Sequence, residues 1–189
     1  MTTALIVVDV QNDFCEGGSL AVAEGARVAA DVGSLLASGR YPVVAATVDH
    51  HVDPGAHFSD EPDFVDSWPP HCRVGTPGVD LHPALQPRPF DAVFTKGEYD
   101  AAYSGFEGDS DGVGLADWLR GHGVDRVDVV GIATDHCVRA TALDAAAAGF
   151  ATRVLLDLTA AVAPDRIPDT LAAFAAAGVA TSGDLPARG

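Results

Sequence analysis

One cysteine, Cys137, stands where a predicted strand gives way to a predicted helix. The apolar run 127–131 is expected to form a buried strand, and an Ala-rich helix should follow from about residue 137 to Ala148. The N-terminus of a helix carries free N–H groups and partial positive charge, both of which favour a thiolate. Cys137 is therefore a candidate nucleophile, although cysteine is also among the residues that most often simply pack in a core.

Three ionisable residues, Asp9, Asp49 and Lys96, also stand at or near the ends of predicted strands. The carboxyl ends of parallel strands meet at one edge of a sheet, so we expect these side chains to converge on Cys137. A carboxylate could take the thiol proton and an ammonium could orient that carboxylate, as covalent catalysis requires. The turn before Cys137 would offer N–H groups to an oxyanion. The alternative is that Asp9 and Lys96 form only a structural ion pair.

A second set of residues has the types and spacing of metal ligands. Asp49 and His51 are followed by His57, and His71 lies farther along the same Pro-rich stretch. Imidazole and carboxylate ligands suit zinc, iron or manganese. His50 could replace His51, but extended backbone places residues 49 and 51 on the same side, which favours His51. The alternative is a set of solvated loop histidines.

Other candidates receive no firm role from the sequence. Cys72 is a possible soft metal ligand, although a small buried hydrophobic residue is the more usual role for such a cysteine. Cys15 and His136 are assigned no function. Four familiar motifs are missing: the dinucleotide-binding G-x-G-x-x-G after the first strand, the P-loop, the redox C-x-x-C and the serine-hydrolase G-x-S-x-G.

The elements that would position these residues alternate between strand and helix. Strands are expected at about 4–10, 41–49, 91–96, 127–131, 152–157 and 179–180, and helices at about 23–38, 114–122, 137–148 and 164–177. This alternation indicates βαβ units and a parallel sheet. We therefore expect one α/β domain over residues 1–189, doubly wound, with a mostly parallel sheet of about six strands and helices on both faces. The Pro-rich segment at about 50–89 is expected to be irregular and to bind the metal.

The composition narrows the classes of partner. The net charge of −16, with only 11 basic residues, argues against nucleic acid and anionic membranes, which both need clustered Lys and Arg. The first residues carry no basic segment typical of a signal peptide, and no apolar run is long enough to span a membrane. Three cysteines are an odd number, so we expect reduced thiols and a cytoplasmic protein.

Six segments follow one another in a specific order: VDVQNDF at 8–14, D-x-H-x5-H at 49–57, SWPPHC at 67–72, TKG at 95–97, YSGF at 103–106 and GIATDHCV at 131–138. Together they resemble the nicotinamidase/pyrazinamidase branch of the isochorismatase-like cysteine hydrolases. The resemblance covers nearly the whole chain and ends in about the last ten residues. The SWPPHC segment and the Asp/His set are its specific features, whereas D-x-Q-x-x-F and the cysteine at a helix start are shared by the superfamily.

The resemblance implies a role for each matching residue. Asp9, Lys96 and Cys137 would be the catalytic base, the orienting cation and the nucleophile. Metal ligands in the family correspond to Asp49, His51, His57 and His71. These would hold one divalent ion, which is zinc, iron or manganese in different members and which binds the ring nitrogen of the substrate.

The resemblance also implies a substrate pocket. Phe14 and Trp68 would stack on a pyridine ring, and Tyr103 would close the pocket, which Ile132 and Ala133 would also line. The peptide between Ile132 and Ala133 is expected to be cis, so that the N–H groups of Ala133 and Cys137 form the oxyanion hole. Lys96 and the helix N-terminus would have to lower the pKa of the Cys137 thiol for activity at neutral pH.

The implied activity is hydrolysis of nicotinamide, and of its analogue pyrazinamide, to the acid and ammonia through a cysteine thioester. This reaction belongs to NAD salvage. Alternatives are another isochorismatase-like cysteine hydrolase and a metallohydrolase in which metal-bound water attacks. The expected partner is a small molecule, neither nucleic acid nor membrane, and the chain should act as a monomer or small homo-oligomer.

Overall fold

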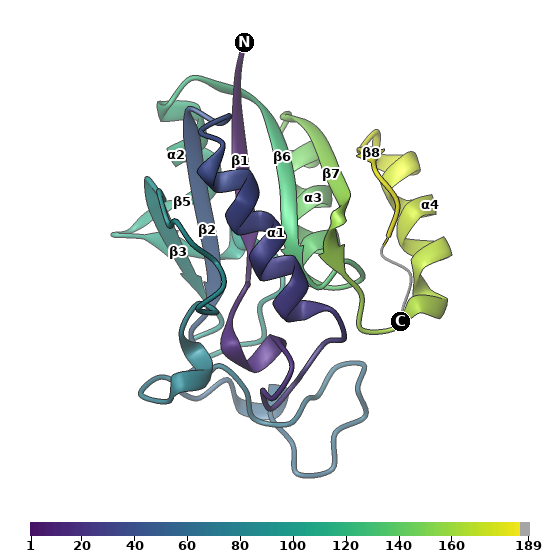
Figure 1. Ribbon diagram of the computed structural model, residues 1–189. Coiled ribbons are helices and arrows are strands. Elements are labelled where there is room, and N and C mark those ends of the chain that lie inside the picture. The colour runs from purple at the N-terminus through teal and green to yellow at the C-terminus, as the bar shows by residue number, and fades with distance from the viewer. Residues whose placement is uncertain (186–189) are drawn as a thin grey trace.

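The computed structural model describes residues 1–185, and over that range eight strands form one twisted sheet in the order β5-β4-β3-β2-β1-β6-β7-β8. The strands are β1 (Thr2–Val8), β2 (Val43–Asp49), β3 (Ala92–Lys96), β4 (Asp109–Ser110), β5 (Val113–Gly114), β6 (Val124–Ile132), β7 (Ala151–Ala160) and β8 (Ala180–Ser182). The helices are α1 (Gly25–Ala37), α2 (Leu115–Gly121), α3 (Cys137–Ala147) and α4 (Ile167–Ala177). Figure 1 shows α1 on one face of the sheet and α3 on the other.

The two faces of the sheet each carry a hydrophobic core. Alternate residues of β1 point to opposite sides, so Ile6 packs in the cluster that includes residues of α2, α3 and α4, while Leu5 and Val7 pack in the cluster with α1. Both faces of β1 are therefore buried, which explains its nearly continuous apolar sequence. The prediction of an α/β fold with helices on both faces is confirmed.

The prediction of about six strands is wrong in one respect. The two additional strands, β4 and β5, contain two residues each and form an antiparallel hairpin beside β3. They lie between the strand predicted at about 91–96 and the helix predicted at about 114–122, and Gly114 overlaps the start of that predicted helix. Two residues are too few to show a periodic pattern of apolar side chains, so periodicity does not predict either strand.

The carboxyl ends of the central strands gather at one edge of the sheet. β1, β2, β3 and β6 are parallel, and β2 is in register with β3 so that Asp49 pairs with Lys96. The Pro-rich segment between β2 and β3 runs beneath this edge in Figure 1 and contains only two short 3-10 turns, Gly55–His57 and Pro77–Val79. The edge and this segment enclose the candidate site.

No helix within residues 1–185 is long and apolar enough to cross a lipid bilayer.

The close approach of β6 to β1 depends on Gly131. This glycine has a φ of +114°, and a Cβ atom there would lie 2.1 Å from the backbone oxygen of Val8. Neither the backbone conformation nor the contact tolerates a side chain. Gly131 therefore allows β6 to end beside β1 immediately before the turn that leads to Cys137.

Replacing Gly131 with alanine should destabilise the protein because the added methyl group meets backbone at a positive φ. We expect a loss of at least about 2 kcal/mol in the free energy of unfolding. Gly121→Ala is the control, because a Cβ atom at Gly121 meets nothing within 4 Å. That variant should stay within about 0.5 kcal/mol of wild type in urea unfolding. Equal stability of the two variants would contradict this account of Gly131.

Candidate active site

A cavity opens at the carboxyl edge of the sheet and collects residues from distant parts of the chain. All five predicted substrate-binding residues line it, together with Cys137 and three of the predicted metal ligands, Asp49, His57 and His71. The five are Phe14, Trp68, Tyr103, Ile132 and Ala133. The cavity wall is mainly apolar and aromatic, as expected for a pocket that binds a flat organic ring.

A buried ammonium group is at the centre of the charged residues. The Nζ atom of Lys96 lies 2.9 Å from Oδ2 of Asp9, donates a hydrogen bond to Oδ1 of Asp49, and is 3.8 Å from Sγ of Cys137. The hydroxyl of Thr47 donates to the other oxygen of Asp9 at 2.6 Å. These four ionisable side chains are at most 7% exposed. The structure therefore brings the three predicted catalytic residues together.

Burial and neighbouring charges shift the pKa values of the Asp9 and Asp49 carboxylates in opposite directions. Burial raises the pKa of Asp9, and the nearby charge of Asp49 adds to this effect, although Lys96 opposes it. Burial also disfavours the charged form of Asp49, but Lys96, His51 and His71 outweigh it and hold the pKa of Asp49 well below its usual range. Asp9 is therefore the more basic of the two, which suits a residue that accepts a proton.

Lys96 remains a cation in this buried position. Burial alone would lower its pKa, but Asp49 and Asp9 reverse that effect and raise the pKa well above its usual range. The ammonium can thus orient Asp9 without itself exchanging a proton.

The pKa of the Cys137 thiol contradicts the expectation drawn from its sequence position. Lys96 does lower it, but burial has the larger effect, and Asp9 and Asp49 add to the burial, so the pKa is raised well above that of a free thiol. The side chain is therefore a neutral thiol in this structure, and a base must remove its proton as it reacts.

The turn before Cys137 has the predicted backbone geometry. The peptide bond between Ile132 and Ala133 is cis, which confirms that prediction. The N–H of Thr134 donates to the carbonyl of Ala160, and the N–H groups of His136 and Val138 donate to the carbonyl of Ala133. These three donors are therefore occupied. The assignment of the Ala133 and Cys137 N–H groups to an oxyanion hole stays a prediction.

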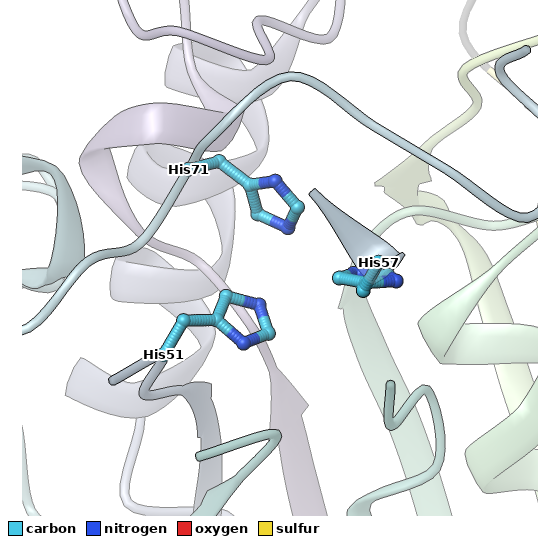
Figure 2. Close-up of side chains that lie close together, drawn as sticks. All are labelled: His51, His57 and His71. Atoms are coloured by element: carbon cyan, nitrogen blue, oxygen red, sulfur yellow. The ribbon is translucent and has the colours of Figure 1, made fainter. Parts of the chain in front are cut away.

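Three histidines form the candidate metal centre. Figure 2 shows the rings of His51, His57 and His71 gathered around one space, and one nitrogen from each lies within 4.8 Å of the others. Oδ2 of Asp49 is 3.5 Å from Nε2 of His51 and 3.7 Å from Nε2 of His71. All four side chains are at most 5% exposed. The four predicted ligands therefore lie together.

The hydrogen bonds of the imidazoles fit a bound metal ion. Nδ1 of His51 is 2.5 Å from the carbonyl oxygen of Gly97, and Nδ1 of His71 is 2.8 Å from that of Pro69. A carbonyl oxygen accepts a hydrogen bond from a protonated Nδ1, so the Nε2 atoms of His51 and His71 present lone pairs to the shared space. Nε2 of His51 and Nδ1 of His57 are buried and have no hydrogen-bond partner in the described part of the chain. Buried polar atoms of this kind are explained by a cation between them.

His50 and His51 lie in different surroundings. Nδ1 of His50 lies 3.4 Å from Glu98, and its side chain is 35% exposed, whereas His51 is fully buried in the histidine group. His51, which strand alternation favours, is thus the one of the two that lies with His57 and His71. Cys72 does not belong to the group; its N–H donates to Asp13, and burial raises the pKa of its thiol well above the usual range.

Sequence reasoning missed several residues of the site. Thr47 holds Asp9, and Gln11 binds the backbone of Asp49. Thr47 lies two residues before Asp49 in β2, so strand alternation could have placed it on the same side. His136 lines the cavity and meets the Trp68 ring at a centroid distance of 5.1 Å. The apolar wall also includes Leu20, Val22, Ala102 and Val162.

The sequence of this chain matches a known protein family. The family model of the isochorismatase domain matches residues 3–183. The chain is 62% identical over 164 residues to the nicotinamidase/pyrazinamidase of Mycobacterium tuberculosis, covering 86% of this chain and 88% of that protein.

Solved structures of two relatives have the same fold as this chain. A PnC1 from L. infantum in complex with nicotinate superimposes with a TM-score of 0.86 at 36% identity, covering 96% of this chain and 92% of that one. A pyrazinamidase of Pyrococcus horikoshii in complex with zinc gives 0.82 at 34% identity, covering 96% and 99%.

The ligand assignment predicts different results for two neighbouring histidines. His57→Ala should weaken zinc binding at least about tenfold, because it removes one of the four predicted ligands. His50→Ala should retain zinc, because its side chain points to Glu98. Elemental analysis of dialysed protein would measure both. Zinc retained by His57→Ala and lost from His50→Ala would refute the assignment.

Proposed function

The chain belongs to the isochorismatase family, and from that premise we propose that it hydrolyses nicotinamide, and its analogue pyrazinamide, to the corresponding acid and ammonia. The observation that carries the proposal is the contact of Lys96 with Asp9, Asp49 and Cys137, of which Asp49 and Cys137 line the cavity with aromatic side chains. The relatives named for this activity support the choice of substrate. The reaction would serve NAD salvage.

The first step is attack of Cys137 on the carboxamide carbon. Asp9 takes the thiol proton as the carbon–sulfur bond forms, and burial has already raised the pKa of Asp9 toward that task. Lys96 stays protonated throughout and holds Asp9 toward the sulfur. The negative charge that develops on the amide oxygen would be held by the N–H groups of Ala133 and Cys137.

The second half of the reaction returns the cysteine to its starting state. Asp9 gives its proton to the amide nitrogen, the carbon–nitrogen bond breaks, and ammonia leaves a thioester on Cys137. A water molecule then attacks the thioester carbon while Asp9 accepts one of its protons. The carbon–sulfur bond breaks, the proton passes to sulfur, and the acid is released.

The aromatic residues would hold the ring of the substrate. Phe14 and Trp68 lie on the cavity wall, where they can stack on a pyridine or pyrazine ring, and the indole N–H of Trp68 donates to the hydroxyl of Tyr103 at 3.0 Å. This bond holds Tyr103 beside Trp68 on the cavity wall. Asp49, His51, His57 and His71 would hold the divalent ion, and a bound ion of this type supplies a coordination position for a ring nitrogen.

The free cysteines bear on where in the cell the protein would act. The proposed mechanism needs a reduced thiol, and Cys15, Cys72 and Cys137 are free within the described part of the chain, which supports a cytoplasmic location. We also propose that residues 1–189 act as one domain, in a monomer or a small homo-oligomer.

The nucleophile can be tested by ammonia release from nicotinamide. Cys137→Ala should lose at least about 10³-fold in kcat, because the covalent route is removed and no other nucleophile replaces it. Cys15→Ala is the matched control, since it removes another buried thiol that lies outside the cavity. Wild-type rates in Cys137→Ala would sink the mechanism and favour attack by metal-bound water.

A further inference from the structure

The side chain of Gln11 makes contacts that the proposed mechanism does not use. Gln11 is fully buried, and its amide nitrogen donates to the carbonyl of Asp49 at 2.8 Å and to that of Val79 at 2.9 Å. Its amide oxygen accepts the N–H of Asp49 at 2.9 Å. Both side-chain donors and the acceptor are therefore occupied, and two of the three bonds go to one residue.

These bonds replace a missing rung of the sheet. The last backbone hydrogen bond between the two segments runs from the N–H of Asp9 to the carbonyl of Thr47. Asp9 then adopts a φ of +48°, and the chain turns away from β2. Without β1 beside it, the backbone of Asp49 would be buried with an unpaired donor and acceptor, a costly arrangement. The primary amide of Gln11 supplies both partners in the manner of a peptide group.

Because the Gln11 side chain pairs with the backbone of Asp49, residues 9–11 both orient the Asp9 carboxylate and hold the end of β2. The turn at Asp9 frees its carboxylate to face Lys96 and Cys137, while Gln11, two residues later, still holds the end of β2. The backbone of residues 10–12 is itself fixed, because the N–H of Asn12 donates to Asp80 and the N–H of His82 donates to Val10. Hydrogen bonds thus hold both the backbone around Gln11 and its side chain in place.

Asp49 is the residue where a small displacement would matter most. Its two carboxylate oxygens face different groups: Oδ1 accepts from Lys96, and Oδ2 lies close to His51 and His71. The neighbouring strand fixes only one side, where Asp49 pairs in register with Lys96. Gln11 fixes the other.

We propose that Gln11 is a positioning residue that fixes the backbone of Asp49 and thereby sets the affinity of the histidine centre for a divalent metal ion. The inference rests on the proposed metal site. Residues that orient a ligand without touching the ion typically change metal affinity about 10- to 100-fold when replaced.

The test compares three variants of the full chain. Gln11→Met keeps the length of the side chain and removes all three hydrogen bonds. Gln11→Glu keeps the accepting oxygen but points a second oxygen at the carbonyls of Asp49 and Val79. Asn12→Ala is the matched control, because it removes one side-chain bond to the same loop, from Asn12 to the carbonyl of Pro77, without touching a ligand.

The measurement is the Kd for Zn²⁺ on metal-stripped protein, by competition with a chelator, alongside the melting temperature of the same metal-free samples. We expect Kd to rise at least about tenfold in Gln11→Met and Gln11→Glu and to stay close to wild type in Asn12→Ala. Wild-type affinity in a folded Gln11 variant would overturn the proposal, as would an equal loss in Asn12→Ala. If Gln11→Met does not fold, Gln11→Glu decides alone.

Zinc binding is measured without substrate, so the two proposals can fail separately. A wild-type protein that binds zinc but releases no ammonia from nicotinamide would refute the proposed function and leave the role of Gln11 intact. A Gln11→Met variant that hydrolyses nicotinamide and binds zinc as wild type does would refute only the role of Gln11.

Discussion

The site depends on one buried ammonium group, that of Lys96, which is shared by the carboxylates of Asp9 and Asp49. Removing a charge from water costs several kcal/mol, so each of these groups is stable inside the protein only because the others are present. One positive and two negative charges leave a net negative charge beside three imidazoles. A divalent cation at the histidine group would compensate that charge, which is a physical reason for the metal and the catalytic residues to be neighbours.

The ammonium group of Lys96 also contributes to the different protonation behaviour of Asp9 and Asp49. Lys96 and the histidines hold Asp49 ionised, which suits its predicted role as a metal ligand, while burial leaves Asp9 more basic than an ordinary aspartate. The thiol of Cys137 is neutral for the same reason that Asp9 is basic, since burial penalises every anion in this space. Proton transfer from Cys137 to Asp9 therefore moves a negative charge between two buried positions, next to a cation that contacts both.

Much of this arrangement could be predicted from the sequence because it follows from parallel strands. Asp9, Asp49 and Lys96 were recognised as strand ends, and parallel strands bring such ends to one edge. The choice of His51 over His50 followed from the alternation of side chains along extended backbone. Each of these inferences needed only the local chain direction and the order of elements along the chain.

The parts that could not be predicted depend on three-dimensional surroundings. The sign of the Cys137 pKa shift required the extent of burial, which a helix start does not reveal. The role of Gln11 required the turn at Asp9, and the hairpin of β4 and β5 is too short to leave a pattern. In each case, an interaction between distant segments outweighed the local tendency of the sequence.

The covalent intermediate on Cys137 is the central claim, and mass spectrometry of enzyme quenched with acid during turnover of nicotinamide tests it most directly. The account predicts an intact protein heavier by one nicotinoyl group, with the added mass on the peptide that contains Cys137 and absent from Cys137→Ala. Turnover with no acylated protein at any quench time, or an acyl group on a residue other than Cys137, would contradict it.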